Sequence, residues 1–371
     1  MAFNQIRKAF IVLIGFLLSI ASVIGQEIIV KKEHGITVVY NPREPIAHKG
    51  QTPALTLEED LSIKSVPNKE NPTFFQISAV RADDEGNIYI LDPRAGAIIV
   101  FNKSGEYIRN VGRQGQGPGE LEMPVGLQLL ASAKSLAVAS FGKLSYFSLS
   151  GEFQKQIINP IQDPVPRIDS NGNIVARRTV FLESKVKEEL VKFDANMRQL
   201  LEVAQIELEG PHSGKKRNPF PKGIFFSVMN DDGIVWGINT DYVLTLIDPK
   251  GKTKMKIVKT YKPIKITDEE KLKMVEERSG GKGNLSQYQF PDYYPPFLDI
   301  QSDDTGKIIV GTYEFDQEGH RYYDIFDETG RYIAKFAFPG APSFIKNNLL
   351  YCIKEDKDGN QAVIRFRMKW Q

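Results

Sequence analysis

Short runs of alternating apolar and polar residues recur along most of the chain, separated by compact polar turns. Alternation with a period of two predicts strands that bury one face. Asp-Gly or Asn-Gly turns between such runs predict β-hairpins. In four turns, three polar residues precede a Gly and an apolar run follows it; they begin at Asp83, Asp169, Asn230 and Asp303. The pattern therefore predicts an all-β protein built from hairpins.

A second hairpin follows these turns and defines a repeat. It consists of an apolar pair, a short turn that usually contains Gly, and another alternating run. The anchoring apolar residues are Phe101, Phe147, Phe193, Ile247 and Phe326, and the first three are spaced 46 residues apart. Two hairpins supply four strands in about 45 residues, which is the size of one β-propeller blade.

The number of blades follows from counting these units. Complete units start near Phe74, Val125, Val165, Gly223 and Tyr294. The C-terminal tail supplies three further strands, and residues 55–66 supply a fourth. An N-terminal strand that completes the last blade closes the ring and removes an open sheet edge. We therefore predict a six-bladed β-propeller over residues 55–371, preceded by an N-terminal arm at residues 26–54.

The first unit is also similar to a known repeat. Residues 83–124 follow the order Asp, two polar residues, Gly-Asn-Ile-Tyr, a hairpin, and a glycine-rich link that ends at Pro124. This stretch resembles an NHL repeat, and the chain resembles secreted bacterial six-bladed propellers of that kind. The resemblance implies the propeller fold but almost nothing about activity, because one fold hosts many functions.

The glycine-rich link, residues 111–120, contains four glycines in ten residues. A phosphate-binding glycine loop must follow a strand and open a helix, so that the helix N-terminus faces the anion. Here Pro118 and Pro124 interrupt the sequence, and the next apolar run predicts a strand. The glycines are therefore expected to carry the chain between two blades, where only Gly adopts the required φ angles at low cost.

One insertion, residues 262–293 approximately, interrupts the repeat between blades four and five. Thr267 and Glu270 form a capping box that predicts a short helix through about Glu277. Tyr293 and Tyr294 follow in an aromatic and proline-rich segment. We expect the insertion to cap the channel mouth, with the tyrosines either stacking on a sugar or peptide or fastening the insertion to the propeller.

The N-terminus predicts export. Arg7 and Lys8 precede a mostly apolar run at residues 9–24, and small residues at Val23 and Gly25 suit a cleavage site. Residues 1–25 are therefore expected to be a signal peptide, and the mature protein to be periplasmic or extracellular without stable membrane insertion. Retention of the segment as an anchor is the alternative. Cleavage before Gln26 leaves no N-terminal cysteine, so no lipoprotein is predicted there.

Charge and cysteine content exclude several classes of partner and site. Removing residues 1–25 takes away two positive charges and leaves 46 basic against 46 acidic residues. A neutral protein lacks the basic field that nucleic-acid binding requires. Cys352 is the single cysteine, so neither a disulfide nor a cysteine-based metal site is predicted.

The candidate ligand site lies at one mouth of the central channel, where inter-blade links meet the turns between the second and third strands of each blade. The expected ligand contacts there are Arg94, Arg177, Arg321, Tyr242, Tyr293 and Tyr294. Converging arginines favour a polar or acidic ligand through bidentate contacts. The alternative is that these charges pair with one another and tie blades together.

No catalytic residue and no set of metal ligands is predicted, and no cofactor is expected. A single calcium ion at the channel mouth is an alternative, because its ligands would come from different blades and would form no local motif. We therefore expect a binding or protein-interaction module for a protein, peptide or carbohydrate. The alternative is a metal-dependent lactonase, lyase or glycan-processing enzyme with its site at the channel mouth.

Overall fold

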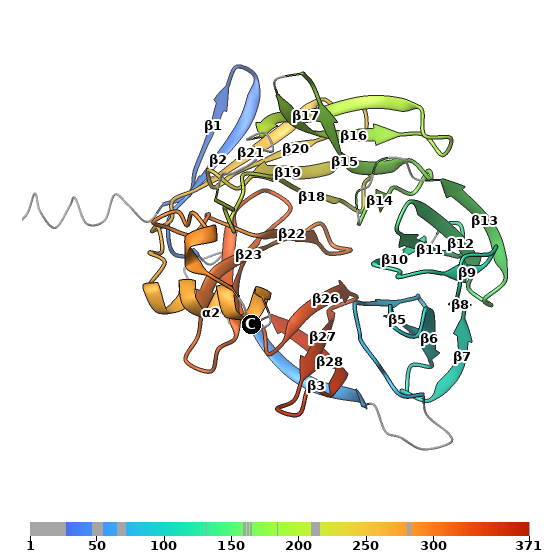
Figure 1. The fold of residues 1–371 in the computed structure, drawn as a ribbon. Helices are drawn as coiled ribbons and strands as arrows, with labels where there is room; N and C mark the ends of the chain where they lie inside the picture. Colours follow the sequence, from blue (N-terminus) through green and yellow to red (C-terminus); the bar gives the residue numbers. More distant parts are fainter. Residues whose placement is uncertain are drawn as a thin grey trace, which may run out of the picture.

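The computed structural model describes residues 27–46, 55–64, 72–130, 132–158, 161, 163, 165–183, 185–208, 216–279 and 283–370. The expected signal peptide lies outside these residues. Six β-sheets stand radially around a central channel and form a propeller (Figure 1). The all-β six-bladed fold predicted from the repeat is confirmed.

Each blade contains four antiparallel strands that follow one another outward from the channel. Blade one is β4 (Ala79–Ala82), β5 (Ile88–Asp92), β6 (Ala97–Phe101) and β7 (Tyr107–Val111). Blade two is β10 (Gly126–Leu130), β11 (Ser135–Ser140), β12 (Lys143–Ser148) and β13 (Phe153–Ile158). Blade three is β14 (Arg167–Ile168), β15 (Ile174–Phe181), β16 (Val186–Phe193) and β17 (Gln199–Leu208).

The remaining blades follow the same order. Blade four is β18 (Ile224–Val228), β19 (Ile234–Ile238), β20 (Val243–Ile247) and β21 (Thr253–Lys259). Blade five is β22 (Asp299–Ser302), β23 (Ile308–Phe315), β24 (Arg321–Phe326) and β25 (Tyr332–Ala337). Blade six is β26 (Ala341–Lys346), β27 (Leu349–Glu355), β28 (Gln361–Trp370) and the N-terminal β3 (Leu55–Lys64).

The N-terminal strand closes the ring as predicted. β3 pairs antiparallel with β28, from Leu55 opposite Trp370 to Lys64 opposite Ala362. Arg365 donates to Asp60 on β3 at 2.7 Å, which adds a charged contact to the backbone ladder. The last blade therefore combines a strand from the N-terminal part of the chain with the three C-terminal strands.

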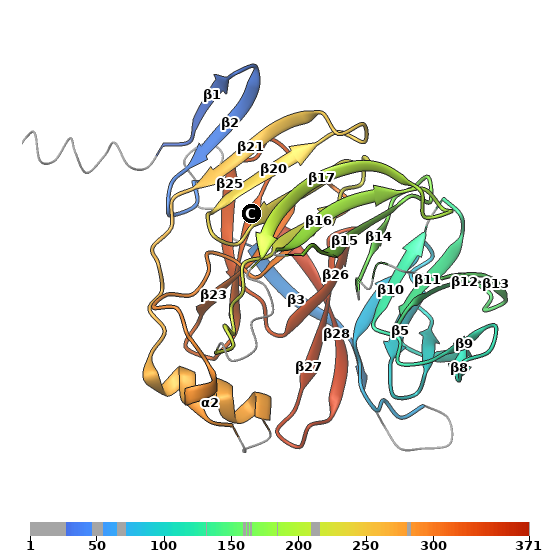
Figure 2. The ribbon, with the colours of Figure 1, turned by 45° about the horizontal axis from the view of Figure 1, so that its top comes forward.

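The arm preceding β3 forms a hairpin that the sequence pattern did not predict. β1 (Ile29–Glu33) and β2 (Ile36–Asn41) extend blade four to six strands, and β2 runs parallel to β21 (Figures 1 and 2). Asn41 fixes the arm to blade five, because its amide donates to the Gly330 carbonyl at 2.9 Å and accepts from the Tyr332 N–H at 2.7 Å.

The glycine-rich link is structural. β8 (Arg113–Gln114) and β9 (Glu120–Leu121) pair within it, and β10 is the next element. Gly119 has a φ of +76°, which favours glycine. No helix follows the link, so the geometry of a phosphate loop is missing.

The one α-helix among the described elements is α2 (Asp268–Ser279), and a single-turn 3-10 helix, η2 (Leu285–Gln287), follows it. The predicted capping box is confirmed, because the Thr267 N–H donates to the Glu270 carboxylate at 2.7 Å and the Glu270 N–H donates to the Thr267 hydroxyl at 3.2 Å. Within the described part of the chain, no helix combines the length and apolar character needed to cross a bilayer.

Candidate functional site

The central channel contains a cavity of about 370 Å³ to which the innermost strands of all six blades contribute. It reaches the turns between the first and second strands, on the face opposite α2. Its polar lining includes Arg81, Gln128, Arg167, Ser227, Gln301 and Asp303. Cavities of this size hold small molecules, so the channel is the first candidate site.

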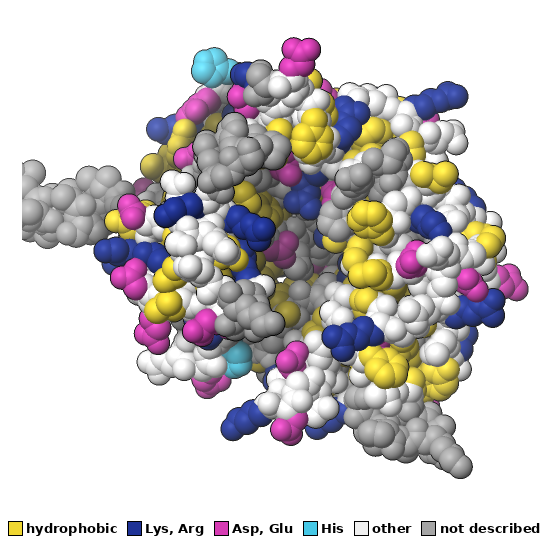
Figure 3. All heavy atoms as spheres, viewed as in Figure 1, with side chains coloured by type: hydrophobic (Ala, Val, Ile, Leu, Met, Phe, Trp, Pro, Cys, Tyr) yellow, Lys and Arg dark blue, Asp and Glu magenta, His cyan; other side chains and the backbone are white. Residues whose placement is uncertain are grey.

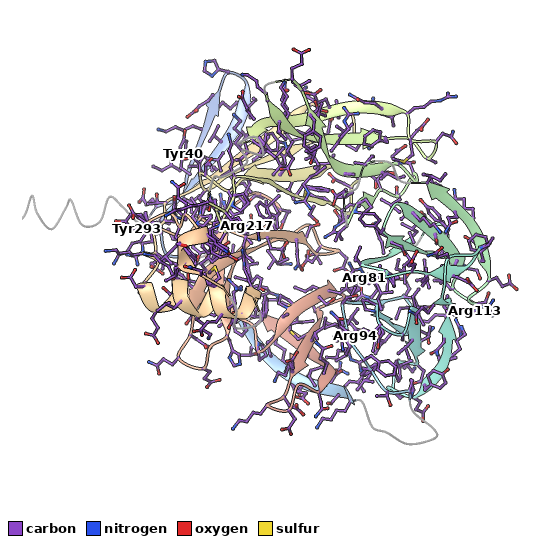
Figure 4. All side chains as sticks on the ribbon, in the orientation of Figure 1. Tyr40, Arg81, Arg94, Arg113, Arg217 and Tyr293 are labelled. Carbon is purple, nitrogen blue, oxygen red and sulfur yellow. The ribbon has the colours of Figure 1, made fainter. Side chains whose placement is uncertain are left out.

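Arg81, Arg167 and Gln301 occupy equivalent positions in blades one, three and five. Each stands two residues before the Asp that begins the first turn of its blade. Each also pairs with the second residue of the next strand, as Arg81 does with Tyr89. The repeat therefore places these side chains at one level of the channel, and Figure 4 shows Arg81 beside the central opening.

Arg81 and Arg167 are held mainly by backbone carbonyls. Nη1 of Arg81 donates to the carbonyls of Val80 at 2.6 Å and Ser343 at 3.1 Å, and Nη1 of Arg167 donates to Val165 at 3.1 Å. Burial, and to a smaller extent the neighbouring charge of Arg167, lowers the pKa of Arg81 to about 9. The charges of the two arginines therefore interact within one cavity, whose turn end also carries Asp169, Asp232, Asp303 and Asp304.

Asp299 lies on the same strand as Gln301 and nearer the other end of the channel. The Gln301 amide donates to Oδ2 of Asp299 at 2.7 Å. Burial raises the pKa of Asp299 above its usual value, although Gln301 and the charge of Arg167 act in the opposite direction. Neither Asp299 nor Arg81 was singled out from the sequence. The Arg or Gln two residues before a turn Asp is the signal that could have found Arg81, Arg167 and Gln301.

The opposite mouth of the channel carries the predicted ligand residues and α2. We call this side the mouth face; it is formed by the inter-blade links and the turns between the second and third strands. Figure 3 shows it hollowed at the centre, with basic and acidic side chains in the hollow. Figure 2 shows α2 standing out from this face, as expected for the insertion.

The six predicted ligand residues do not converge. Arg94 is exposed in the turn between β5 and β6. Arg177 forms an ion pair with buried Asp163, with Nη2 3.3 Å from Oδ1. Tyr242 is only 3% exposed and donates to Asp324 at 2.5 Å. The structure thus places Tyr242 in the core, and it places Arg177 in a contact that ties its blade to the preceding link. Both contacts follow the rule that buried polar groups have hydrogen-bond partners.

Tyr294 fastens the insertion to blade five. Its ring stacks on Tyr313 at 4.6 Å, and Phe220 meets both rings edge-on. Arg321 lies over Tyr313 at 5.7 Å and over Phe315 at 4.5 Å. Arg321 was expected near Tyr293 and Tyr294. It lies over the Tyr313 ring, which in turn stacks on Tyr294.

Tyr293 lies at the periphery rather than at the channel (Figure 4). It is 51% exposed and borders a lateral pocket of about 470 Å³ between blades four and five. Neither Tyr293 nor Tyr294 lines the channel cavity. The backbone pairing of Lys265 with Tyr293 holds this end of the insertion outside the rim.

An apolar rim on the mouth face was not predicted. Large hydrophobic side chains stand exposed in the turns, links and strand ends of blades one to three: Phe141 (85%), Ile158 (79%), Met123 (73%), Phe181 (71%) and Phe75 (64%). We call these five residues the apolar rim. Figure 3 shows hydrophobic side chains gathered on the half of this face away from α2. Alternation within strands could not reveal them, since three lie in turns or links and Ile158 and Phe181 are the last residues of β13 and β15.

Potential metal ligands gather at one place among the described residues. One group, Asp316, Glu318 and His320, brings three ligand atoms within 4.8 Å of one another. It belongs to the turn between β23 and β24, where the Asp316 carboxylate accepts the backbone N–H groups of Glu318 and His320. A hairpin explains this arrangement without a metal. A calcium ion at the channel mouth stays a prediction.

Comparison with known proteins gives the family. A model of a six-bladed β-propeller family, DUF5128, matches residues 68–363. The chain belongs to the DUF5128 family. No curated protein matches the sequence significantly. Membership supports the propeller, while the more specific NHL-repeat likeness stays a proposal.

Solved structures with the same architecture extend this finding. A candidate exported protein from Bacteroides fragilis has 12% identity and a TM-score of 0.55, with 90% of this chain and 99% of that chain covered. A DUF4221 protein from Bacteroides vulgatus has 11% identity and a TM-score of 0.50, with 85% and 98% covered. A gluconolactonase from Xanthomonas campestris has 9% identity and a TM-score of 0.47, with 88% and 99% covered. At these identities the similarity shows the fold alone.

Proposed function

We propose that this DUF5128 protein is an exported interaction module that binds a protein partner through the apolar rim of its mouth face. The observation that carries the proposal is the exposure of Phe75, Met123, Phe141, Ile158 and Phe181 on one face. Large apolar groups gathered on one face are typical of protein-interaction sites. Full burial of such a side chain contributes about 1.5–3 kcal/mol, so several together supply the core of an interface.

Export supports an extracellular or periplasmic partner. The basic residues and apolar run at residues 7–24 suit a signal peptide, and the Bacteroides fragilis neighbour is a candidate exported protein. We further propose that the blades are NHL-like repeats, because residues 83–124 carry that pattern. Loops on a rigid propeller are a suitable support for recognition.

The enzymatic alternative has less support. Carboxylates do gather at the end of the channel opposite α2, but they act as turn acceptors. Asp232 accepts from Ser170 and Asn171, and Asp304 accepts from the Asn347 N–H at 2.9 Å. Groups that hold turns together are poorly placed for acid–base or nucleophilic work.

Site-directed photocrosslinking in the native host tests the interaction proposal. A photoreactive phenylalanine analogue replaces Phe141 or Phe181 in the full chain, and Leu200 serves as the control because it is 55% exposed on the outer strand β17. We expect both rim positions to yield one adduct of the same mass that is absent at Leu200. The adduct should weaken when Met123→Ser is added to the same chain.

Two outcomes would count against the proposal. Rim positions that give no adduct, or the same adducts as Leu200, would remove the protein-binding role. Sedimentation of the purified protein with anionic lipid vesicles, abolished by Phe141→Ser, would assign the rim to a membrane surface instead.

A further inference from the structure

We propose that the central channel is a second binding site, in which Arg81 and Arg167 together bind the oxyanion group of a small polar molecule. This site is separate from the apolar rim. The cavity lies among the innermost strands and reaches the turns on the opposite face, whereas the rim lies in turns, links and strand ends of the mouth face.

The first argument is geometric. Arg81 and Arg167 come from blades one and three, stand at equivalent positions of the repeat and line the same cavity of about 370 Å³. Arginines on separate blades can therefore approach one ligand from two sides. A rigid strand position, unlike a loop, fixes the direction from which each approaches.

The second argument concerns unused donors. Each guanidinium carries five N–H donors in a planar fork. The hydrogen bonds found for the two arginines go to the backbone carbonyls of Val80, Ser343 and Val165, in each case from Nη1. The Arg81 guanidinium also lies over the Phe344 ring at 5.3 Å. No carboxylate of the described residues lies within 4.0 Å of either guanidinium. Donors thus remain for a carboxylate or phosphate group, which the fork contacts in bidentate geometry.

The third argument is electrostatic. Two like charges in one enclosed region repel, and the lowered pKa of Arg81 reflects both its burial and the charge of Arg167. At neutral pH Arg81 remains charged, since its pKa of about 9 lies higher. An anion between the two arginines would relieve the repulsion, which gives the bound state an advantage over the empty channel.

The buried Asp299 carboxylate affects which ligand charge the channel favours. It faces Arg167 through space without forming an ion pair, and burial raises its pKa. Asp299 leaves the two guanidinium groups in excess at their own level of the channel, whereas Asp169, Asp232, Asp303 and Asp304 line the turn end of the cavity together with Lys346. A ligand with one singly charged oxyanion group, such as a carboxylate, therefore suits the level of the arginines. Ser227 and Gln301 add polar groups to the lining, so the body of the ligand is expected to be polar.

Calorimetric titration of the full chain tests this proposal. The probes are glucuronate, neutral glucose as its uncharged counterpart, and inorganic phosphate. We expect glucuronate binding, no glucose binding, and a loss of at least about tenfold in affinity in Arg81→Gln and in Arg167→Gln. Arg113→Gln is the control because Arg113 lies in the link between blades one and two and is 81% exposed; it should bind like the original chain.

Stability distinguishes a binding role from a structural one. Because burial and the charge of Arg167 both disfavour the charged form of Arg81, Arg81→Gln should keep or raise the melting temperature without ligand. Binding of phosphate but not glucuronate would assign the site to a phosphorylated ligand. The proposal is overturned if neither anion binds, or if the Gln variants bind as the original chain does.

Discussion

Lys259 and Asp324 form a buried ion pair across blades four and five, with Nζ of Lys259 3.0 Å from Oδ2 of Asp324. The Tyr242 and Tyr332 hydroxyls donate to the two oxygens of the same carboxylate, each at 2.5 Å. Nζ of Lys259 also lies over the Tyr332 ring at 4.5 Å. Both carboxylate oxygens therefore have partners, and the network connects residues that the sequence places 82 apart, from Tyr242 to Asp324.

Breaking this pair is expected to destabilise the protein strongly. Lys259→Met leaves the Asp324 charge buried without its cationic partner, which typically costs about 3–5 kcal/mol. Lys185→Met is the control, because it removes an ion pair whose partners are about half exposed, and it should cost less than about 1 kcal/mol. The free energy of unfolding in urea measures both changes. Similar losses for the two variants would contradict the importance of the network.

Alkaline conditions should weaken the fold through the same tyrosines. Burial and Asp324 raise the pKa of Tyr242 and of Tyr332 above the ordinary value of 10.0. The unfolded chain then releases protons first, so the free energy of unfolding falls as the pH rises above about 10. Urea unfolding at pH 8 and pH 11 should show this decline.

A matched pair of variants tests the cause of that alkaline decline. Tyr332→Phe should reduce the decline between the two pH values, although it lowers stability at pH 8 by leaving an Asp324 oxygen unpaired. Tyr293→Phe, at an exposed position, should leave the decline unchanged. An unaltered decline in Tyr332→Phe would mean that other groups cause it.

The two neighbouring tyrosines of the insertion should behave differently. Tyr294→Ala removes the stack on Tyr313 and the hydrogen bond to Glu270, and we expect a loss of about 2 kcal/mol. Tyr293→Ala should change stability by less than about 0.5 kcal/mol, as for other exposed side chains. Thermal unfolding checks both. The predicted role of either tyrosine in ligand binding needs the ligand itself and stays a prediction.

Closure of the ring can be tested by truncation. A chain that starts at residue 67 lacks β3 and exposes β28 as an unpaired edge strand. A chain that starts at residue 55 keeps β3 and loses only the hairpin on blade four. We expect the shorter chain to aggregate or melt far lower than the longer one, as followed by light scattering and calorimetry. Equal behaviour would show that β3 does not close the propeller.

The strands, turns and helix follow from the sequence because their causes are local. Polar residues and Gly at Asp83–Gly86 set a hairpin, and the Thr267 capping box starts α2, with every needed contact within a few residues. The repeat length then predicts the blade count. The need to pair the open edge of the last blade predicts the position of β3.

Contacts between distant segments were decided only by the tertiary structure. The parallel pairing of β2 with β21, the burial of Tyr242 against Asp324 and the shared cavity of Arg81 and Arg167 each join residues from different blades or from the arm. Such contacts depend on how the blades pack around the channel axis, which alternation along one strand does not encode. The sequence pattern predicts which residues form turns and strands, whereas the packing of the blades into a ring determines which of them are in contact.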